Sequence, residues 1–251
     1  MRSLKPTSVL QVSYALVLIH FVAAKLPSDI KRCVAGDGKC IIENINVIFN
    51  KKNQGDESFG LTKLEPFTMD DFSIRQDPAS PVAIYLALNN PVVYGSKNVR
   101  ATKVKGFGKT PEGRHEILLE APYISMLSDY VIDGKVLILP IKGEGRSNFT
   151  LVEPKMKIVI DATSRTKDGK IFMDVKDVRV ECKPKRVALH FENLFNGDKA
   201  LGENINSFLN ENWNGIFIEM KAPLYDAISK QIKVGTAKVF SATPYDEIFE
   251  I

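Results

Sequence analysis

Histidine is scarce in this chain, and the catalytic motifs that depend on it are missing. The 251 residues include three histidines, and only His115 and His190 lie beyond residue 24. No Gly-x-Ser-x-Gly elbow is present to carry a hydrolase nucleophile, and His115-Glu116 is not followed by the second histidine of a zinc-protease helix. His190 alternates with the apolar Leu189 and Phe191, so we expect it to face outward. The sequence therefore predicts no enzyme, no bound metal and no cofactor.

Long apolar runs are also missing, except at the N-terminus. Arg2 and Lys5 precede Val9–Ala24, a mostly apolar run of about 16 residues that ends in small side chains. This pattern is typical of a secretory signal peptide. A membrane anchor is the alternative, but the run is shorter than the roughly 20 residues that a spanning helix needs. We therefore expect residues 1–24 to be removed and the rest to be secreted without a membrane span.

The chain has no strong excess of either charge. Its formal net charge is +4, and two of its 34 Lys and Arg residues lie in residues 1–24, which hold none of its 30 Asp and Glu residues. The mature charge of +2 gives no reason to expect nucleic-acid binding, which needs clustered basic residues. No linker rich in Gly, Ser or Pro interrupts residues 25–251, so we expect a single domain.

Cysteine is limited to three residues. Cys33 and Cys40 enclose a short loop and can pair after export, with two free thiols or a metal site as the alternatives. A zinc site is disfavoured because no histidine lies near them in the sequence. Cys182 falls on the apolar side of the alternating segment Val178-x-Val180-x-Cys182, so we expect a buried thiol.

The C-terminal third carries the clearest helical signal. Asp198 follows the turn pair Asn196-Gly197 and can cap a helix. Trp213 and Phe217 widen an apolar stripe that repeats at steps of three, four and seven: Leu201, Ile205, Phe208, Leu209, Ile216, Met220, Leu224 and Ile228. The stripe covers roughly half of the helix surface, which is more than a surface helix usually shows. We therefore expect an enclosed helix, kinked or broken near Lys221 by Pro223.

The region from Phe59 to Phe191 is expected to form strands. Apolar residues alternate with period two in Ile117–Tyr123, Met156–Ala162 and Val187–Phe191. Asp133-Gly134 and Asp168-Gly169 predict hairpin turns, and a change of parity near Lys176–Asp177 predicts a β-bulge. A helix from Ile41 to about Asn50 is expected before them, with Ile42, Ile45 and Phe49 on one face. The expected fold is α+β, with a strongly curved antiparallel sheet around the long C-terminal helix.

Four segments of the chain resemble sequence patterns of the takeout and juvenile-hormone-binding-protein family of insects, and they occur in the same order as in that family. They are KLPSDIKRC with the later cysteine, YVIDGKVLILPIKGEG, NLFNGDKALGENINSFLNENW and VFSATPYDEIF. The resemblance implies a superroll (TULIP-like) fold around an apolar tunnel, a Cys33–Cys40 disulfide, and a secreted carrier of a juvenile-hormone-like terpenoid or a fatty acid. Cys182 has no partner for the second disulfide that some members carry, which favours the takeout-like branch. Feeding, circadian rhythm and hormone transport all remain open as its role.

Aromatic and apolar residues supply the candidate tunnel lining: Tyr123, Tyr130, Phe149, Phe191, Phe195, Phe208, Leu209, Trp213, Phe217, Met220 and Leu224. Such residues more often fill a core than line a cavity, and it is the resemblance that favours a tunnel. In the hormone carriers a tunnel tyrosine binds the ligand, and Tyr123 and Tyr130 both remain candidates. The alternative function is an extracellular protein with a filled core that acts through a protein partner. We expect a monomer, and the sequon Asn148-Phe149-Thr150 predicts glycosylation of Asn148.

Overall fold

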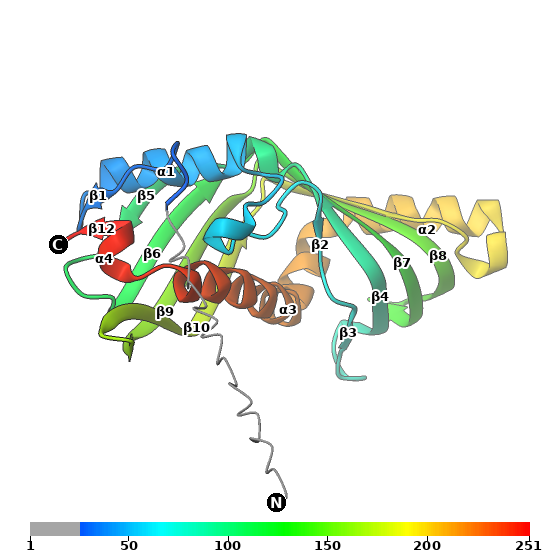
Figure 1. Cartoon of the computed structure of the whole chain (residues 1–251). Coiled ribbons are helices and arrows are strands. Elements are labelled where there is room, and N and C mark those ends of the chain that lie inside the picture. Colours follow the sequence, from blue (N-terminus) through cyan, green and yellow to red (C-terminus); the bar gives the residue numbers. More distant parts are fainter. Residues whose placement is uncertain (1–25) are drawn as a thin grey trace, which may run out of the picture.

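Two antiparallel sheets, a short parallel pair of strands and four α-helices are the main elements of the computed structural model, which describes residues 26–251 (Figure 1). The predicted signal peptide lies outside the described residues. One sheet has the strand order β10-β9-β6-β5 and the other β11-β8-β7-β4-β2, with β3 also paired to β4. The strands are therefore divided between two sheets, where the sequence predicted a single one. An α+β fold with a long C-terminal helix packed against antiparallel strands is confirmed.

The four-stranded sheet consists of β5 (Arg100–Lys105), β6 (Gly113–Glu120), β9 (Lys155–Lys167) and β10 (Lys170–Lys183). The six-stranded sheet consists of β2 (Phe67–Thr68), β3 (Phe72–Arg75), β4 (Val82–Tyr94), β7 (Tyr123–Val136), β8 (Leu139–Val152) and β11 (Arg186–Phe191). The helices are α1 (Gly38–Lys51), α2 (Lys199–Glu211), α3 (Trp213–Ala242) and α4 (Tyr245–Ile248). Helix α1 packs beside β5, and α3 packs along β10 (Figure 1). Helix α2 packs beside β11.

The two ends of the described chain meet at one end of the molecule. The short strands β1 (Cys33–Val34) and β12 (Phe249–Glu250) pair in parallel there (Figure 1). The Cys33–Cys40 disulfide is present beside them. Helix α1 begins three residues earlier than expected, because the Asp37 carboxylate caps it by accepting the backbone N–H groups of Lys39 and Cys40. This contact network connects the first helix to the last strand.

The expected single C-terminal helix is divided at Asn212. Asp198 caps α2 as predicted, with its carboxylate 3.0 Å from the backbone nitrogen of Leu201. At the other end of α2, the backbone N–H and the side-chain amide of Asn212 both donate to the carbonyl of Phe208, at 3.0 and 2.8 Å. The next helix, α3, starts at Trp213. The apolar periodicity continues across this junction, so the sequence pattern did not reveal it.

Of the kink or break expected near Pro223, the break does not occur. Helix α3 continues through Pro223 to Ala242, as the continued apolar spacing at Leu224 and Ile228 indicated. A proline has no N–H to donate, so Pro223 leaves the carbonyl of Glu219 without its helical partner. The side-chain amide of Gln76, which follows β3, donates to that carbonyl at 2.6 Å. The helix is therefore completed by a side chain from the six-stranded sheet.

Two asparagines of α2 satisfy the free backbone edge of β11. Asn206 accepts the N–H of Phe191 and donates to its carbonyl, both at 2.9 Å. Asn210 does the same for Leu189, at 3.0 and 2.7 Å. Four residues of helix rise about 6 Å and two residues of strand about 6.6 Å, so the two spacings match. Helix α2 thus takes the place of a further strand at this edge.

The edge of β10 is covered in the same way by α3. The Ser229 hydroxyl accepts the N–H of Val180 at 3.0 Å, and the Tyr225 hydroxyl donates to the carbonyl of Cys182. Again, side chains four residues apart on a helix meet backbone groups two residues apart on a strand. Cys182 is a free, buried thiol, as predicted.

Of the two predicted hairpin turns, one is confirmed and one is wrong. Asp168 and Gly169 join β9 to β10 with φ of 51° and 73°, and the bulge follows between Val175 and Asp177. Asp133 and Gly134 instead lie inside β7, and the turn to β8 is formed by Leu137 and Ile138, four residues farther along. Gly134 is needed there because a Cβ atom would lie 2.3 Å from the carbonyl oxygen of Ala83 on β4.

Replacing Asn206 with leucine tests the helix-to-edge contacts. Asn206→Leu keeps the size of the side chain but leaves the N–H and carbonyl of Phe191 unpaired. We expect it to lower the free energy of unfolding by about 1–3 kcal/mol in urea denaturation. Asn204→Leu, at an exposed position of the same helix, is the control and should change stability by no more than about 0.5 kcal/mol. Equal effects of the two substitutions would contradict this role.

Candidate functional site

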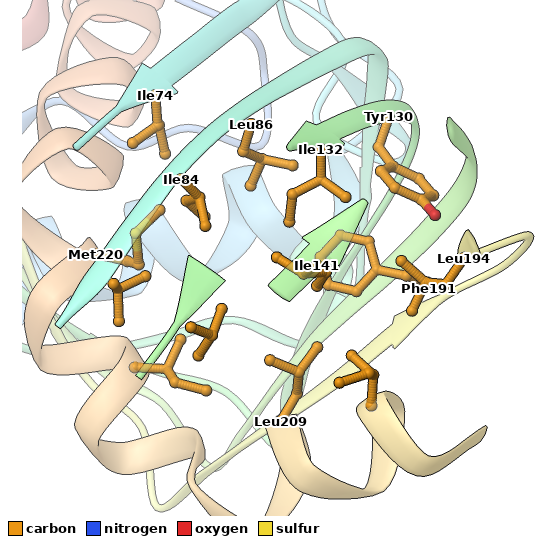
Figure 2. Packing of buried hydrophobic residues seen from close by; sticks show 14 of the residues in the cluster. Ile74, Ile84, Leu86, Tyr130, Ile132, Ile141, Phe191, Leu194, Leu209 and Met220 are labelled. Carbon is orange, nitrogen blue, oxygen red and sulfur yellow. The ribbon is translucent and has the colours of Figure 1, made fainter. Parts of the chain in front are cut away.

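One end of the six-stranded sheet is filled core on its inner face. Residues that are direct cross-strand partners project to the same face of a sheet. The strand register therefore shows which residues of neighbouring strands lie side by side, in one row, on the inner face. Figure 2 shows the cluster, with Ile84 and Leu86 from β4, Tyr130 and Ile132 from β7, Ile141 from β8, Phe191 from β11, Leu209 from α2 and Met220 from α3. The exposed fractions of these side chains are 1–6%. Four predicted lining residues, Tyr130, Phe191, Leu209 and Met220, therefore belong to a tightly packed region.

The next inner rows of the same sheet are less covered. Met126 pairs with Phe149, which pairs with Leu189 on β11. These three side chains share the face of Tyr130 but are only half-buried. Ile124 and its partner Leu151 form the following row and are also half-buried. The packing on this face therefore loosens toward the middle of the molecule.

The four-stranded sheet shows the same change from its own end. Ile160 and Val178 are cross-strand partners and are 2% and 3% exposed in a second buried cluster. Two and four residues along β9, Ile158 and Met156 are half-buried, as is Ile117, the partner of Ile158. A small buried cluster is formed by Val99, Ala101, Leu119 and Ala121. Ile124 of the other sheet packs against it, and so do Met156 and Ile158, so the two half-buried regions meet.

We name this region the central band. It comprises Ile124, Met126, Phe149, Leu151 and Leu189 of the six-stranded sheet and Ile117, Met156 and Ile158 of the four-stranded sheet. From the helices, the half-buried Phe208 and Leu224 pack against the adjoining filled core, and so does Phe195 of the turn after β11. All of these side chains are apolar. The central band is the candidate site. Of its strand residues, only Phe149 is among the lining residues predicted from the sequence.

Tyr123, which was predicted to line a tunnel, does not lie on the inner face of the sheet with the central band. It is 44% exposed, and it alternates in β7 with the inward-facing Ile124 and Met126. Two other predicted residues, both half-buried on α3, lie outside the buried clusters. Trp213 borders an open surface cavity of about 460 Å³ with Lys185 and Arg186. Phe217 packs its ring against Tyr225, with centroids 6.4 Å apart.

The hydroxyl of Tyr130 is already engaged within the protein. It donates to the carbonyl of Glu192 at 2.6 Å, and the ring packs edge-on against Phe191 with centroids 4.8 Å apart. Burial, followed by the nearby Glu192 and Glu144 carboxylates, raises the pKa of Tyr130 to about 12. Gly143 makes room for this arrangement, since a Cβ atom there would lie 2.9 Å from the hydroxyl oxygen. Tyr130 therefore holds the segment after β11 in place.

The two histidines have different environments. His190 is exposed, as predicted. His115 is 2% exposed, and its Nδ1 accepts the backbone N–H of Phe107 at 2.7 Å. Its Nε2 therefore carries the proton and donates to the carbonyl of Pro111 at 2.9 Å. Burial lowers the pKa of His115. Its inward position could have been inferred from its alternation with Ile117 in β6.

The sequon lies on the outer face of β8. Asn148 is exposed, and its side-chain oxygen accepts hydrogen bonds from the hydroxyls of Ser125 and Thr150 at 2.9 and 3.1 Å. The side chain is thus accessible on the face opposite the central band, and its glycosylation stays a prediction.

Comparison with known proteins gives one family. Residues 9–250 match the family model described as Haemolymph juvenile hormone binding protein (JHBP). The circadian clock-controlled protein daywake of Drosophila melanogaster is 27% identical over 229 residues, covering 89% of this chain and 88% of that protein. The protein of the same name from Drosophila yakuba is 27% identical over 230 residues, with the same coverage.

A solved structure has the same fold. The crystal structure of Epiphyas postvittana Takeout 1 matches with a TM-score of 0.78 and 22% identity, covering 88% of this chain and all of that chain. Within residues 26–251 there is no helix with the length and apolar character that crossing a membrane requires.

The burial of His115 predicts acid sensitivity. Because its pKa in the folded state lies below the ordinary value of 6.5, the unfolded chain takes up the proton first as the pH falls. The contribution of His115 to stability is present above about pH 6.5 and is lost as the pH falls through the folded-state pKa. Urea unfolding at a series of pH values from 7.5 to 5 should show this loss. His115→Gln should flatten that part of the profile, whereas the exposed control His190→Gln should keep it. Parallel profiles for all three proteins would contradict the assignment.

Proposed function

Because this chain belongs to the haemolymph juvenile hormone binding protein family, we propose that it is a secreted carrier of one small apolar molecule. Its family is one of binding proteins and not of enzymes. The molecule would lie against the central band, in a tunnel between the sheets and the C-terminal helices. Both classes suggested by the resemblance, a terpenoid of the juvenile-hormone type and a fatty-acid-like lipid, have the apolar surface that this region can cover.

The observation that carries this proposal is the uneven burial of the inner face. Large buried clusters lie at both ends of the molecule, while the apolar side chains of the central band between them remain half-buried, even where they border a small buried cluster. A filled core would bury the middle most completely, because the middle is farthest from solvent. Covering apolar surface is favourable by about 25 cal/mol per Å², so an apolar ligand would stabilise this region without a charged contact. Small-molecule sites are commonly of this type.

We also propose that the protein is secreted, that residues 25–251 form a single domain, and that the protein is a monomer. The Cys33–Cys40 disulfide supports an extracellular location, since such bonds persist in oxidising environments. The pairing of β1 with β12 joins the beginning and the end of the described chain, which supports one domain. The fly relatives are named as circadian clock-controlled. The corresponding role proposed for this chain is rhythmic supply of its ligand, and feeding and hormone transport are the alternatives.

Two methionine-to-tryptophan substitutions test the ligand site. Met126 lies in the central band and is half-buried, whereas Met220 is 5% exposed in the filled core. Met126→Trp should weaken uptake of a fluorescent fatty acid at least tenfold and leave the thermal midpoint of the ligand-free protein nearly unchanged, because the added volume occupies the ligand's place. Met220→Trp should cost about 1–3 kcal/mol of stability through overpacking.

The two variants together separate a carrier from a filled-core interaction protein. If Met126→Trp lowers the thermal midpoint as much as Met220→Trp does, the central band is packed core. If the wild-type protein takes up no fluorescent fatty acid and no neutral terpenoid, the carrier function itself is wrong.

A further inference from the structure

A pair of buried serines lies at the inner end of the central band. Ser128 of β7 and Ser147 of β8 are direct cross-strand partners on the inner face, one register step from Met126 and Phe149. They are 6% and 3% exposed. On their other side, Tyr130 and Leu88 close the filled core, each 1% exposed. The serine pair thus lies at the boundary between the half-buried central band and the filled core.

The hydrogen bonds of the pair leave bonding capacity unused. The two hydroxyl oxygens are 2.8 Å apart, and the Ser147 hydroxyl also lies 3.2 Å from the carbonyl oxygen of Ser128, to which it can donate. When Ser147 donates to that carbonyl, Ser128 donates to the Ser147 oxygen, and both lone pairs of the Ser128 oxygen stay free to accept. The Ser128 proton can also turn to a new acceptor while Ser147 keeps its bond to the backbone. Ser128 can therefore bind either a donor or an acceptor at little cost.

The surroundings of the pair contain no charged side chain on the sheet. The inner rows of β4, β7, β8 and β11 consist of apolar residues and glycines, with Ser128, Ser147 and Tyr130 as the polar exceptions, and the Tyr130 hydroxyl is occupied by Glu192. A carboxylate brought to the serines would be buried without a cation, which is strongly unfavourable. A neutral oxygen would find a hydrogen-bond partner there.

We propose that Ser128 and Ser147 form a polar subsite that binds the uncharged oxygen-bearing end of the ligand, so that the protein selects a neutral alcohol or ester over a fatty-acid anion. This proposal rests on the proposed carrier function. The apolar part of the ligand then lies along Met126, Phe149 and Leu189, toward the four-stranded sheet.

The test is displacement of a neutral, apolar naphthylamine dye from the full secreted protein by hexadecanol and by palmitate at pH 7.4. The wild-type protein should bind hexadecanol at least tenfold more tightly than palmitate. In the Ser128→Ala/Ser147→Ala variant, affinity for hexadecanol should fall about tenfold while dye affinity and the thermal midpoint stay close to wild type. Ser125→Ala, on the outer face of the same strand, is the matched control and should behave as wild type.

The outcomes separate the subsite from the carrier function. Unchanged hexadecanol affinity in the double variant, or tighter binding of palmitate than of hexadecanol by the wild-type protein, would overturn the subsite while the carrier function stands. If the wild-type protein binds neither the dye nor either of the two lipids, the subsite and the carrier function are both overturned. If the double variant is not secreted, the single Ser128→Ala variant is used, because it keeps the Ser147 bond to the Ser128 backbone, and it must meet the same criteria.

Discussion

The structure depends on how the sheet edges at β11 and β10 are satisfied. Unpaired backbone groups on an edge strand are costly when buried and promote association when exposed. Here α2 covers β11 through Asn206 and Asn210, and α3 covers β10 through Tyr225 and Ser229. Each pair is spaced by one helical turn, which matches two strand residues. These contacts fix the height and rotation of both helices against the sheets, and so set the space between them.

Helices held by their polar contacts need not fill the interior to stay in place. The filled clusters at the two ends supply the apolar burial that stabilises the fold, and the half-buried central band between them is free to serve a ligand. Under the proposed carrier function, the residues that provide stability are separate from those that would bind the ligand. Tyr130 illustrates the separation, because its buried hydroxyl holds the segment after β11, whereas the buried serine pair keeps unused hydrogen-bonding capacity.

Prediction from the amino-acid sequence succeeded where the reason for a residue lies in its own sequence neighbours. The Asp198 cap, the Asp168-Gly169 turn and the bulge before Asp177 are local devices, and all three are present. It failed where the reason lies in a distant partner. Gly134 makes room for the Ala83 carbonyl, the helix at Pro223 is completed by Gln76, and the Tyr130 hydroxyl binds Glu192. The same limit applies to the candidate site. Met126, Phe149 and Leu189 become one row only when three strands are placed in register. The alternation from Ile117 to Tyr123 placed Tyr123 on the inward side, but β6 ends at Glu120 and a new strand begins at Tyr123.

The central claim is that the interior holds one small apolar molecule, and native mass spectrometry of the gently purified, secreted protein tests it most directly. The account predicts a species heavier than the bare chain by the mass of one lipid, which disappears on denaturation and is restored by adding a neutral long-chain alcohol. A clean mass of the bare chain that shows no uptake of added alcohol, ester or fatty acid would contradict it.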